Sequence, residues 1–533
     1  MPTPTIDEGF FRGIICIGGI MPIGGVGMSI PEWAKKMKGE HQAIQEKGGL
    51  YYLYDVKYSY DPAKKRSKTA SKTYLGRLDR DKGLVEKAIR IPAEKAGSRI
   101  GCPLEYEASR LLEALGGDIR EALVSVFGER EGDAIMAIGK IGVIEKQPEK
   151  RIRNAYETSY ESVLHPGLAL SPASISRLTE EIGRDRDAQL RFMRRFVGGA
   201  SHLIFDGTRL VCYSGGVSLA RVGYNHSGIW DPQVNLLYCF SLRPSKMPVY
   251  YMPFAGNKPD VSNLMTSVRE LGLEGVCLIC DKGFRDEGSL PELRESGITL
   301  ITPLRRTSSR VDYSFMEGRE GSAAAFGGSA FLYRGRPIYY RVTQRCECVD
   351  AEVKRRGRKP KGYVPKTERV RRDQVVLYMD SRLREDEESD YARRMVRGEE
   401  GFTAEGMAES EKYFGTIALS VNADMGAEEL FQTYKERELI EDGNKAYKHV
   451  LGKFASNKQG DDSYNGWLFL NHVSLMLYYR VLGRIKEKGL SSKYSVEDVI
   501  DVAKRITMQN IGGRWNENVP ALSDMKPYTE VMQ

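Results

Sequence analysis

The sequence predicts an α/β protein whose central sheet is assembled from two separated stretches of the chain. Short apolar segments between residues 199 and 305 alternate between strand-like and helix-like spacing. A second, strongly helical stretch begins at about Ala427. Asp281 and Glu441 are 160 residues apart, more than two short elements need, so an insertion must lie between the two stretches.

The elements expected between residues 199 and 305 follow one another in a definite order. They are strands at 202–206 (continuing into 210–213), 234–240 and 247–253, a helix at 260–273, a strand at 276–281, a helix at 289–296 and a strand at 298–302. The order β-β-β-α-β-α-β is that of the ribonuclease-H-like fold. We therefore predict a ribonuclease-H-like core interrupted by a β-rich insertion, with a helical and β-hairpin N-terminal region.

The N-terminal half of the chain divides into two predicted parts. Residues 1–100 form a β-hairpin region with a basic turn at 64–68, because alternating apolar residues flank that turn. Residues 101–198 have helical periodicity. Within them, Ser171 followed by Pro172 marks a helix start, and the spacing over 171–182 is typical of the second helix of a helix-turn-helix. The same pattern is common in plain helical bundles, so both interpretations stay open.

The rest of the chain divides into four predicted parts: 199–305 as the first part of the core, 306–425 as a β-rich basic insertion, 426–485 as the second part of the core, and 486–533 as a C-terminal helical region. Within the insertion, residues 354–372 carry ten Lys or Arg against one Glu. Arg356, Arg358 and Lys359 lie in this stretch and are predicted to contact DNA phosphates, as clustered cations do. The alternative is a disordered, solvated loop.

Composition and cysteine usage favour a cytoplasmic protein. Eighty Lys and Arg against 72 Asp and Glu give a net charge of +8, modest for this length. Eight scattered cysteines do not form the framework of a secreted scaffold. The apolar stretch 13–28 is too short to span a bilayer and lacks a preceding basic region, so no membrane helix or signal peptide is expected. The apolar segment 467–479 is expected to be a buried helix with His472 as a satisfied core histidine.

Two aspartates close the first and fourth expected strands of the core. Those strands are neighbours in this topology and lie about 5 Å apart, so Asp206 and Asp281 are expected side by side. Two such carboxylates repel each other unless a cation lies between them, and hard oxygen ligands favour Mg²⁺. The alternative is that each aspartate only ends a strand or begins a turn.

A third carboxylate lies in the helical stretch that begins at about Ala427. Tyr434, Arg437, Glu441 and Lys448 fall at offsets of 3, 7 and 14 residues, which on a helix confines them to an arc of about 60°. Such a face suits a phosphodiester and a metal ion. The alternative is an ordinary solvated charged face.

These residues resemble the DDE transposases of bacterial and archaeal insertion sequences, in the subgroup with the Tyr-x2-Arg-x3-Glu-x6-Lys signature. The signature is complete at Tyr434, Arg437, Glu441 and Lys448. The segments Phe-Asp-Gly-Thr at 205–208, Pro-Phe-Ala-Gly-Asn-Lys-Pro-Asp at 253–260 and Asp-Lys-Gly-Phe at 281–284 are also similar to that family. The resemblance covers roughly residues 170–310 and 410–485, and Lys282 stands where many relatives carry Arg.

The resemblance implies a transposase that cleaves DNA at the ends of an insertion sequence and joins them to target DNA by two-metal phosphoryl transfer. Asp206, Asp281 and Glu441 would be the catalytic residues and the ligands of Mg²⁺, for which Mn²⁺ can substitute. Tyr434, Arg437 and Lys448 would contact phosphates. The expected partners are double-stranded transposon ends and target DNA, with a homodimer in the synaptic complex, in the nucleoid of the cytoplasm.

Two other functions remain open. Another ribonuclease-H-like nuclease would share the aspartates but not the signature or the long insertion. A catalytically inactive or domesticated sequence-specific DNA-binding protein would keep the fold without the reaction.

Overall fold

The computed structural model divides the chain into two compact units, residues 1–99 and residues 100–533. The described residues are 30–47, 49–61, 66–81, 83–86, 101–146, 148–223, 230–258, 261–281, 284, 289–318, 323–352, 367–437, 455–456, 458–520 and 525–532.

The first unit is an antiparallel sheet of four strands in the order β1-β2-β3-β4. The strands are β1 (Gln42–Lys47), β2 (Leu50–Asp61), β3 (Arg66–Asp79) and β4 (Gly83–Glu86). A short helix, α1 (Glu32–Lys35), buries Ala34 against Leu53 and Leu78 on one face of the sheet. The predicted hairpin is the β2–β3 pair, and β1 and β4 extend it on either side.

The second unit begins with helices, as the helical pattern predicts. They are α2 (Glu107–Leu115), α3 (Gly117–Phe127), α4 (Glu129–Ile144), α5 (Ile152–Glu157), α6 (Glu161–Leu164), α7 (Pro172–Arg184) and α8 (Arg186–Val197). The predicted start of α7 is confirmed, because the Ser171 hydroxyl accepts a hydrogen bond from the backbone N–H of Ser174 and Pro172 occupies the first turn. One face of α7 is buried, with Ile175 and Ile182 in the core.

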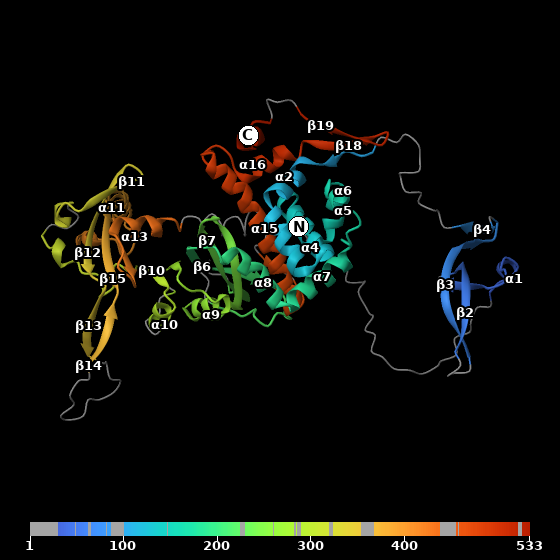
Figure 1. The fold of residues 1–533 in the computed structure, drawn as a ribbon, viewed down its shortest axis with the longest axis horizontal. Helices are drawn as coiled ribbons and strands as arrows, with labels where there is room; N and C mark the ends of the chain where they lie inside the picture. The colour runs from blue at the N-terminus through green and yellow to red at the C-terminus, as the bar shows by residue number, and fades with distance from the viewer. Residues whose placement is uncertain are drawn as a thin grey trace, which may run out of the picture. The chain divides into compact units, whose positions relative to one another are not determined.

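A ten-stranded mixed sheet forms the centre of this unit (Figure 1). Its strands run in the order β11-β12-β15-β16-β10-β9-β6-β7-β8, and β17 (Ala455–Ser456) pairs with β6. The predicted core strands are β6 (His202–Cys212), β7 (Gln233–Arg243), β8 (Met247–Ala255), β9 (Cys277–Cys280) and β10 (Thr299–Leu304), and the predicted helices are α9 (Val261–Leu271) and α10 (Leu290–Glu295). The first three strands are antiparallel, whereas β9 is parallel to both β6 and β10.

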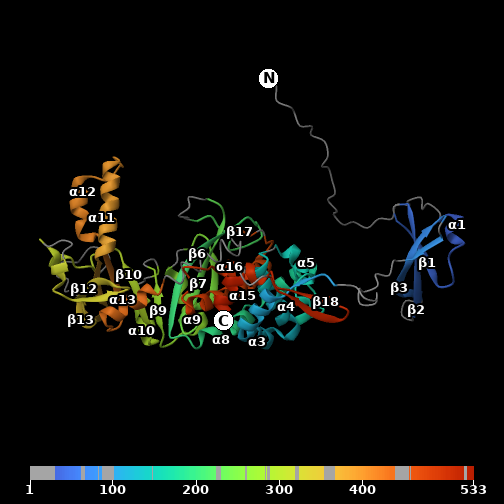
Figure 2. The ribbon, with the colours of Figure 1, turned by 90° about the horizontal axis from the view of Figure 1, so that it is seen from above.

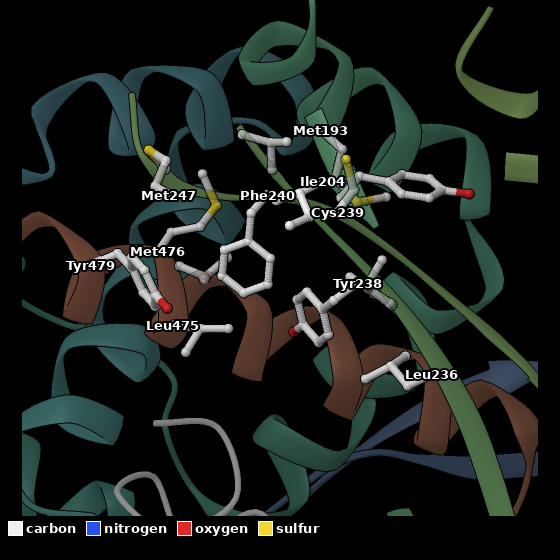
Figure 3. Close-up of a cluster of buried hydrophobic side chains, with 14 of the residues drawn as sticks. Met193, Ile204, Leu236, Tyr238, Cys239, Phe240, Met247, Leu475, Met476 and Tyr479 are labelled. Atoms are coloured by element: carbon white, nitrogen blue, oxygen red, sulfur yellow. The ribbon is translucent and has the colours of Figure 1, made fainter. Parts of the chain in front are cut away.

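Helices cover both faces of this part of the sheet. On one face, Tyr238 and Phe240 of β7 pack against the long helix α15 (Asp461–Glu487), where Phe240 and Tyr479 have ring centroids 5.4 Å apart (Figure 3). On the other face, the Tyr250 hydroxyl of β8 donates to Glu270 of α9 at 2.5 Å. The apolar segment predicted as a buried helix is the middle of α15, and it packs against this face of the sheet.

Helices α7 and α15 approach each other through glycines. A Cβ atom on Gly466 would lie 1.8 Å from the backbone oxygen of Thr179, and one on Gly183 would lie 1.8 Å from that of Asp462.

We expect Gly466→Ala to lower the free energy of unfolding by about 3 kcal/mol or more, because the two backbones must separate. Gly483→Ala is the matched control on the same helix. It meets nothing within 4 Å and should stabilise the protein by up to about 1 kcal/mol. Urea unfolding of both variants measures the difference, and equal effects would contradict the close packing.

His472 of α15 is fully buried between the rings of Tyr238 and Tyr251, with centroids 5.8 and 5.2 Å away. The prediction of a core histidine is confirmed, and neither ring nitrogen has a hydrogen-bond partner among the described residues. Burial, assisted by the charge of Arg186, lowers the pKa of His472 to about 3. The tight aromatic packing that excludes water from the imidazole is therefore what keeps it neutral.

This histidine makes stability depend on pH. Between its ordinary pKa near 6.5 and its lowered pKa, the unfolded chain binds a proton that the folded chain rejects. Stability is thus complete above about pH 6.5 and falls with decreasing pH, by up to about 1.4 kcal/mol per pH unit. We expect His472→Phe to remove this part of the dependence and to equal or exceed the wild type at pH 7.5. Urea titrations between pH 4.5 and 7.5 measure it, and parallel curves for the two proteins would refute the assignment.

The predicted insertion extends the central sheet instead of forming a sheet of its own. Its strands are β11 (Ala330–Tyr333), β12 (Arg336–Gln344), β15 (Gln374–Asp380) and β16 (Thr416–Val421), and β16 pairs with β10 of the core. A separate hairpin, β13 (Glu347–Glu352) with β14 (Thr367–Arg372), leads into and out of the basic stretch. Helices α11 (Ser381–Val396) and α12 (Ala404–Ser410) lie side by side, with Tyr391 and Phe402 in ring contact at 4.9 Å (Figure 2).

The C-terminal region is not entirely helical. Helix α16 (Val496–Ala503) begins after Ser495, whose hydroxyl accepts a hydrogen bond from the N–H of Asp498. A hairpin of β18 (Thr507–Ile511) and β19 (Arg514–Asn518) follows, and β18 also pairs with β5 (Leu104–Glu105); the last described helix is α17 (Lys526–Met532). No described helix is long and apolar enough to cross a membrane.

Candidate functional site

The two predicted aspartates lie on neighbouring strands: Asp206 is inside β6, and Asp281 directly follows β9. Strands β6 and β9 are parallel, and Phe205 is in register with Cys280, so Asp206 and Asp281 are the next residues on each chain. The Phe205 ring faces Tyr250 on the α9 side, with centroids 6.5 Å apart. Since successive strand residues alternate between faces, both aspartates are placed toward the opposite face, the one that α15 covers.

Arg437 of the predicted signature contacts Asp281 and is hydrogen-bonded to Tyr434. The Arg437 guanidinium donates through Nη1 to the Tyr434 hydroxyl at 2.9 Å, and the same nitrogen lies 3.5 Å from Oδ1 of Asp281. Burial tends to lower the pKa of Arg437, but Tyr434, Asp281 and Asp206 together raise it above its ordinary value. Four residues predicted from three distant stretches of sequence therefore share one electrostatic environment.

The helix that carries Tyr434 is shorter than predicted. Helix α13 (Ala427–Lys435) ends where the N–H of Glu436 bonds to the carbonyls of Gln432 and Thr433 and the N–H of Arg437 bonds to that of Tyr434. Arg437 therefore lies in a turn after the helix, and the prediction of one uninterrupted helix face through this residue is wrong. The turn still brings its guanidinium onto the Tyr434 hydroxyl.

An ion pair joins the turn after the helix to the core sheet. Glu436 accepts a hydrogen bond at 2.7 Å from Arg243, at the end of β7. The pair ties the turn to the core sheet and is the positioning contact that sequence reasoning missed. These two residues are 193 positions apart, and nothing in the local sequence of either one points to the other.

The insertion strands hold the other end of α13. The Tyr378 hydroxyl of β15 donates to the carbonyl of Ala427 at 2.7 Å, and the Gln374 side chain bonds to both backbone groups of Met425. Phe431 is fully buried and packs on Tyr378 with centroids 5.0 Å apart. The insertion thus has a structural part in the site, because it supports the helix that presents Tyr434.

The chain returns to the same sheet beyond residue 454. Ala455 and Ser456 pair with Val211 and Cys212 of β6, and the N–H of Tyr213 bonds to the carbonyl of Ser456. The segment between Arg437 and Ala455 therefore begins beside Asp281 and ends on the strand that carries Asp206.

Several predicted site residues lie outside the described part of the chain. They are Glu441 and Lys448 of the signature and Arg356, Arg358 and Lys359 of the basic stretch. Asp260 and Lys282, quoted for the family resemblance, are also outside it. Strand β14 is the last part of the basic stretch, and its first residue, Thr367, pairs with Glu352 at the end of β13.

The donor set of the site suits a hard divalent cation. Asp206 and Asp281 offer carboxylate oxygens on one face of the sheet, the Asp281 side chain is 40% exposed, and the cation that lies against it is Arg437. Within the described residues, no group of three His, Cys, Asp or Glu lies close enough together to hold a metal ion.

The cysteines are separate from this site. Cys277 and Cys280 are buried in β9, and burial raises the pKa of both thiols. Cys346 and Cys348 are free, and Cys348 is exposed.

No protein-family model and no curated protein matches the sequence. Two solved structures are similar in part. One is a piggyBac transposase synaptic complex with hairpin DNA, with 11% identity over 76% of this chain and 82% of that chain and a TM-score of 0.35. The other is a Mos1 transposase paired-end complex with the left transposon end, with 9% identity over 29% of this chain and 58% of that chain and a TM-score of 0.14. Both TM-scores are below 0.5, so the function is inferred from the geometry of the site and not from these two likenesses.

Proposed function

We propose that the protein is a DNA transposase of the DDE class, in the insertion-sequence subgroup with the Tyr-Arg-Glu-Lys signature. It would cleave DNA at the ends of its element and join the freed 3′ ends to target DNA. The observation that carries the proposal is that Asp206 of β6, Asp281 directly after β9, Tyr434 of α13 and Arg437 in the turn after α13 lie together.

The strand order and the short distance in sequence between Arg437 and Glu441 support this proposal. The arrangement β8-β7-β6-β9-β10, with only the first three strands antiparallel, fits a ribonuclease-H-like core. Glu441 is four residues beyond Arg437, a span of at most about 14 Å when fully extended. That length permits Glu441 to complete a site with the two aspartates.

The chain's own residues would bind and orient the DNA phosphate. Arg437 would exchange its contact with Asp281 for a phosphate oxygen, and the hydrogen bond to Tyr434 would hold the guanidinium in place as it does so. Lys448 would add a second cation. Asp206, Asp281 and Glu441 would hold Mg²⁺, or Mn²⁺ in its place, which when bound polarises the phosphate and activates the attacking oxygen.

The proposal is tested with DNA taken from both flanks of the reading frame. The purified protein, Mg²⁺ and these fragments should give nicked ends and then products joined to an unrelated plasmid. Cleavage without joining would favour another ribonuclease-H-like nuclease. Binding without cleavage would favour an inactive DNA-binding protein.

Removing the Tyr434 hydroxyl should slow cleavage without unfolding the protein. Tyr434→Phe keeps the buried ring but leaves Arg437 without its neutral hydrogen-bond partner. Hydrogen bonds to charged groups are worth about 1.5–3 kcal/mol, so we expect a loss of about 10- to 100-fold in the cleavage rate. Tyr494→Phe, in a different part of the unit, is the control. A Tyr434→Phe protein with the wild-type rate would remove this residue from the site.

A further inference from the structure

The first unit has a sheet face that its own helix does not cover. Helix α1 packs on one face, where Trp33 contacts the Tyr51 ring edge-on at 5.5 Å. The opposite face presents three tyrosines, Tyr52 and Tyr54 from β2 and Tyr74 from β3, and Tyr54 and Tyr74 are direct partners in the strand pairing. These three tyrosines are not part of the core that the sheet forms with α1.

The three rings form a continuous aromatic surface. The centroid of Tyr74 lies 6.1 Å from that of Tyr52 and 5.5 Å from that of Tyr54, and Tyr74 is 36% exposed. The tyrosines line a hollow of about 460 Å³ together with Gln45 and Lys47. This volume is within the range of about 300–1,000 Å³ that is usual for small-ligand sites.

Cations surround the hollow. Lys72 lies 4.1 Å above the Tyr54 ring and donates to the Gln45 side chain at 2.9 Å, while the Lys47 side chain lines the hollow itself. Residues 30–86 contain thirteen Lys or Arg and eight Asp or Glu, a net charge of +5 in a chain whose total is +8. The ligand that matches flat rings bordered by lysines is a flat aromatic group attached to an anion.

We propose that this face binds unpaired bases of single-stranded DNA, with Tyr52, Tyr54 and Tyr74 as the stacking platform and Lys47 and Lys72 on the phosphates. Stacking on aromatic side chains requires base faces that a duplex keeps covered, so the single strand is the form that fits. A phosphate is also a stronger partner for Lys72 than the neutral Gln45 amide. The inference rests on the proposed function only in taking DNA as the nucleic acid.

The test uses the full-length protein, without divalent ions so that no cleavage occurs, and fluorescence anisotropy. The probes are labelled oligothymidylate of about 16 nucleotides and a blunt duplex of the same length. Tyr52→Ala/Tyr54→Ala/Tyr74→Ala should weaken oligothymidylate binding at least about tenfold. The matched triple Tyr→Phe variant keeps the rings and should stay within about twofold of wild type. Lys47→Gln and Lys72→Gln should each lower the salt dependence by about 0.7 in log–log slope.

Three outcomes would overturn the inference: unchanged binding by the alanine variant, equal loss in the phenylalanine variant, or equal loss for the duplex. If the triple alanine variant does not fold, Tyr74→Ala alone removes the most exposed ring, and a loss of less than about twofold overturns the inference as well. The binding assay contains no divalent ion and measures no cleavage, so its result does not depend on the proposed reaction. Failure of the platform and failure of the proposed reaction are therefore separate results.

Discussion

Asp281→Asn is expected to reduce DNA cleavage by at least about 10³-fold while leaving the fold intact. Asparagine keeps the shape of the side chain but removes the charge that a divalent cation requires. A bound metal supplies several kcal/mol of transition-state stabilisation, and each 1.4 kcal/mol corresponds to a factor of ten in rate. The Asp281 side chain is 40% exposed and its ion pair with Arg437 spans 3.5 Å, so little stability depends on it.

The measurement is single-turnover cleavage of an end fragment with Mg²⁺. Asp501→Asn, which changes an exposed aspartate of α16, is the matched control and should cleave like the wild type. Thermal unfolding should be the same for all three proteins within about 2 °C. An Asp281→Asn protein that still cleaves would exclude this residue as a metal ligand.

The second large effect is expected from Lys140, which is fully buried in α4. Its ammonium lies 2.5 Å from Glu113 of α2 and 2.6 Å from Glu161 of α6, and Glu161 is also fully buried. Burial raises the pKa of Glu161, whereas His165 and Lys140 outweigh the effect of burial on Glu113 and lower its pKa to about 2. Lys140→Met removes the cation from two carboxylates and should cost about 3–5 kcal/mol of stability.

A double variant separates this effect from lost packing. In Lys140→Met/Glu161→Gln no buried charge remains at Glu161, so at least half of the lost stability should return. Lys150→Met, at an exposed position before α5, is the control and should change stability by less than about 0.5 kcal/mol. Urea unfolding at pH 7.5 gives the values. A double variant as unstable as the single one would show that the lost stability comes from packing and not from charge.

The core strands could be predicted because each buried strand is a short run of apolar residues that is visible in the sequence itself. The apolar segments at 203–205 and 276–280 indicate β6 and β9, and the order of elements fixes which strands pair. Placing Asp206 beside Asp281 needed no more than this order. Tyr434 and Arg437 were found through their spacing, although the contact between them is made by a turn after α13 and not by a helix face.

What the sequence could not predict depends on contacts between distant residues. The ion pair of Glu436 with Arg243 ties the turn after α13 to the core, and the pairing of β16 with β10 joins the insertion to the core sheet. Charged strands such as β14, with the sequence Thr-Glu-Arg-Val-Arg-Arg, lack the apolar alternation by which strands are recognised. Lys140 is hidden for a similar reason, because a lysine in a helix is normally read as a surface residue.

The central claim is that Asp206, Asp281 and Glu441 hold one divalent cation site. It is tested most directly by replacing Mg²⁺ with Fe²⁺ in the full-length protein and mapping where ascorbate and peroxide cut the polypeptide. We predict cuts close to residues 206, 281 and 441 that disappear with excess Mg²⁺ and in the Asp281→Asn protein. Cuts at the first two positions but not near Glu441, or no cuts that Mg²⁺ suppresses, would contradict the claim.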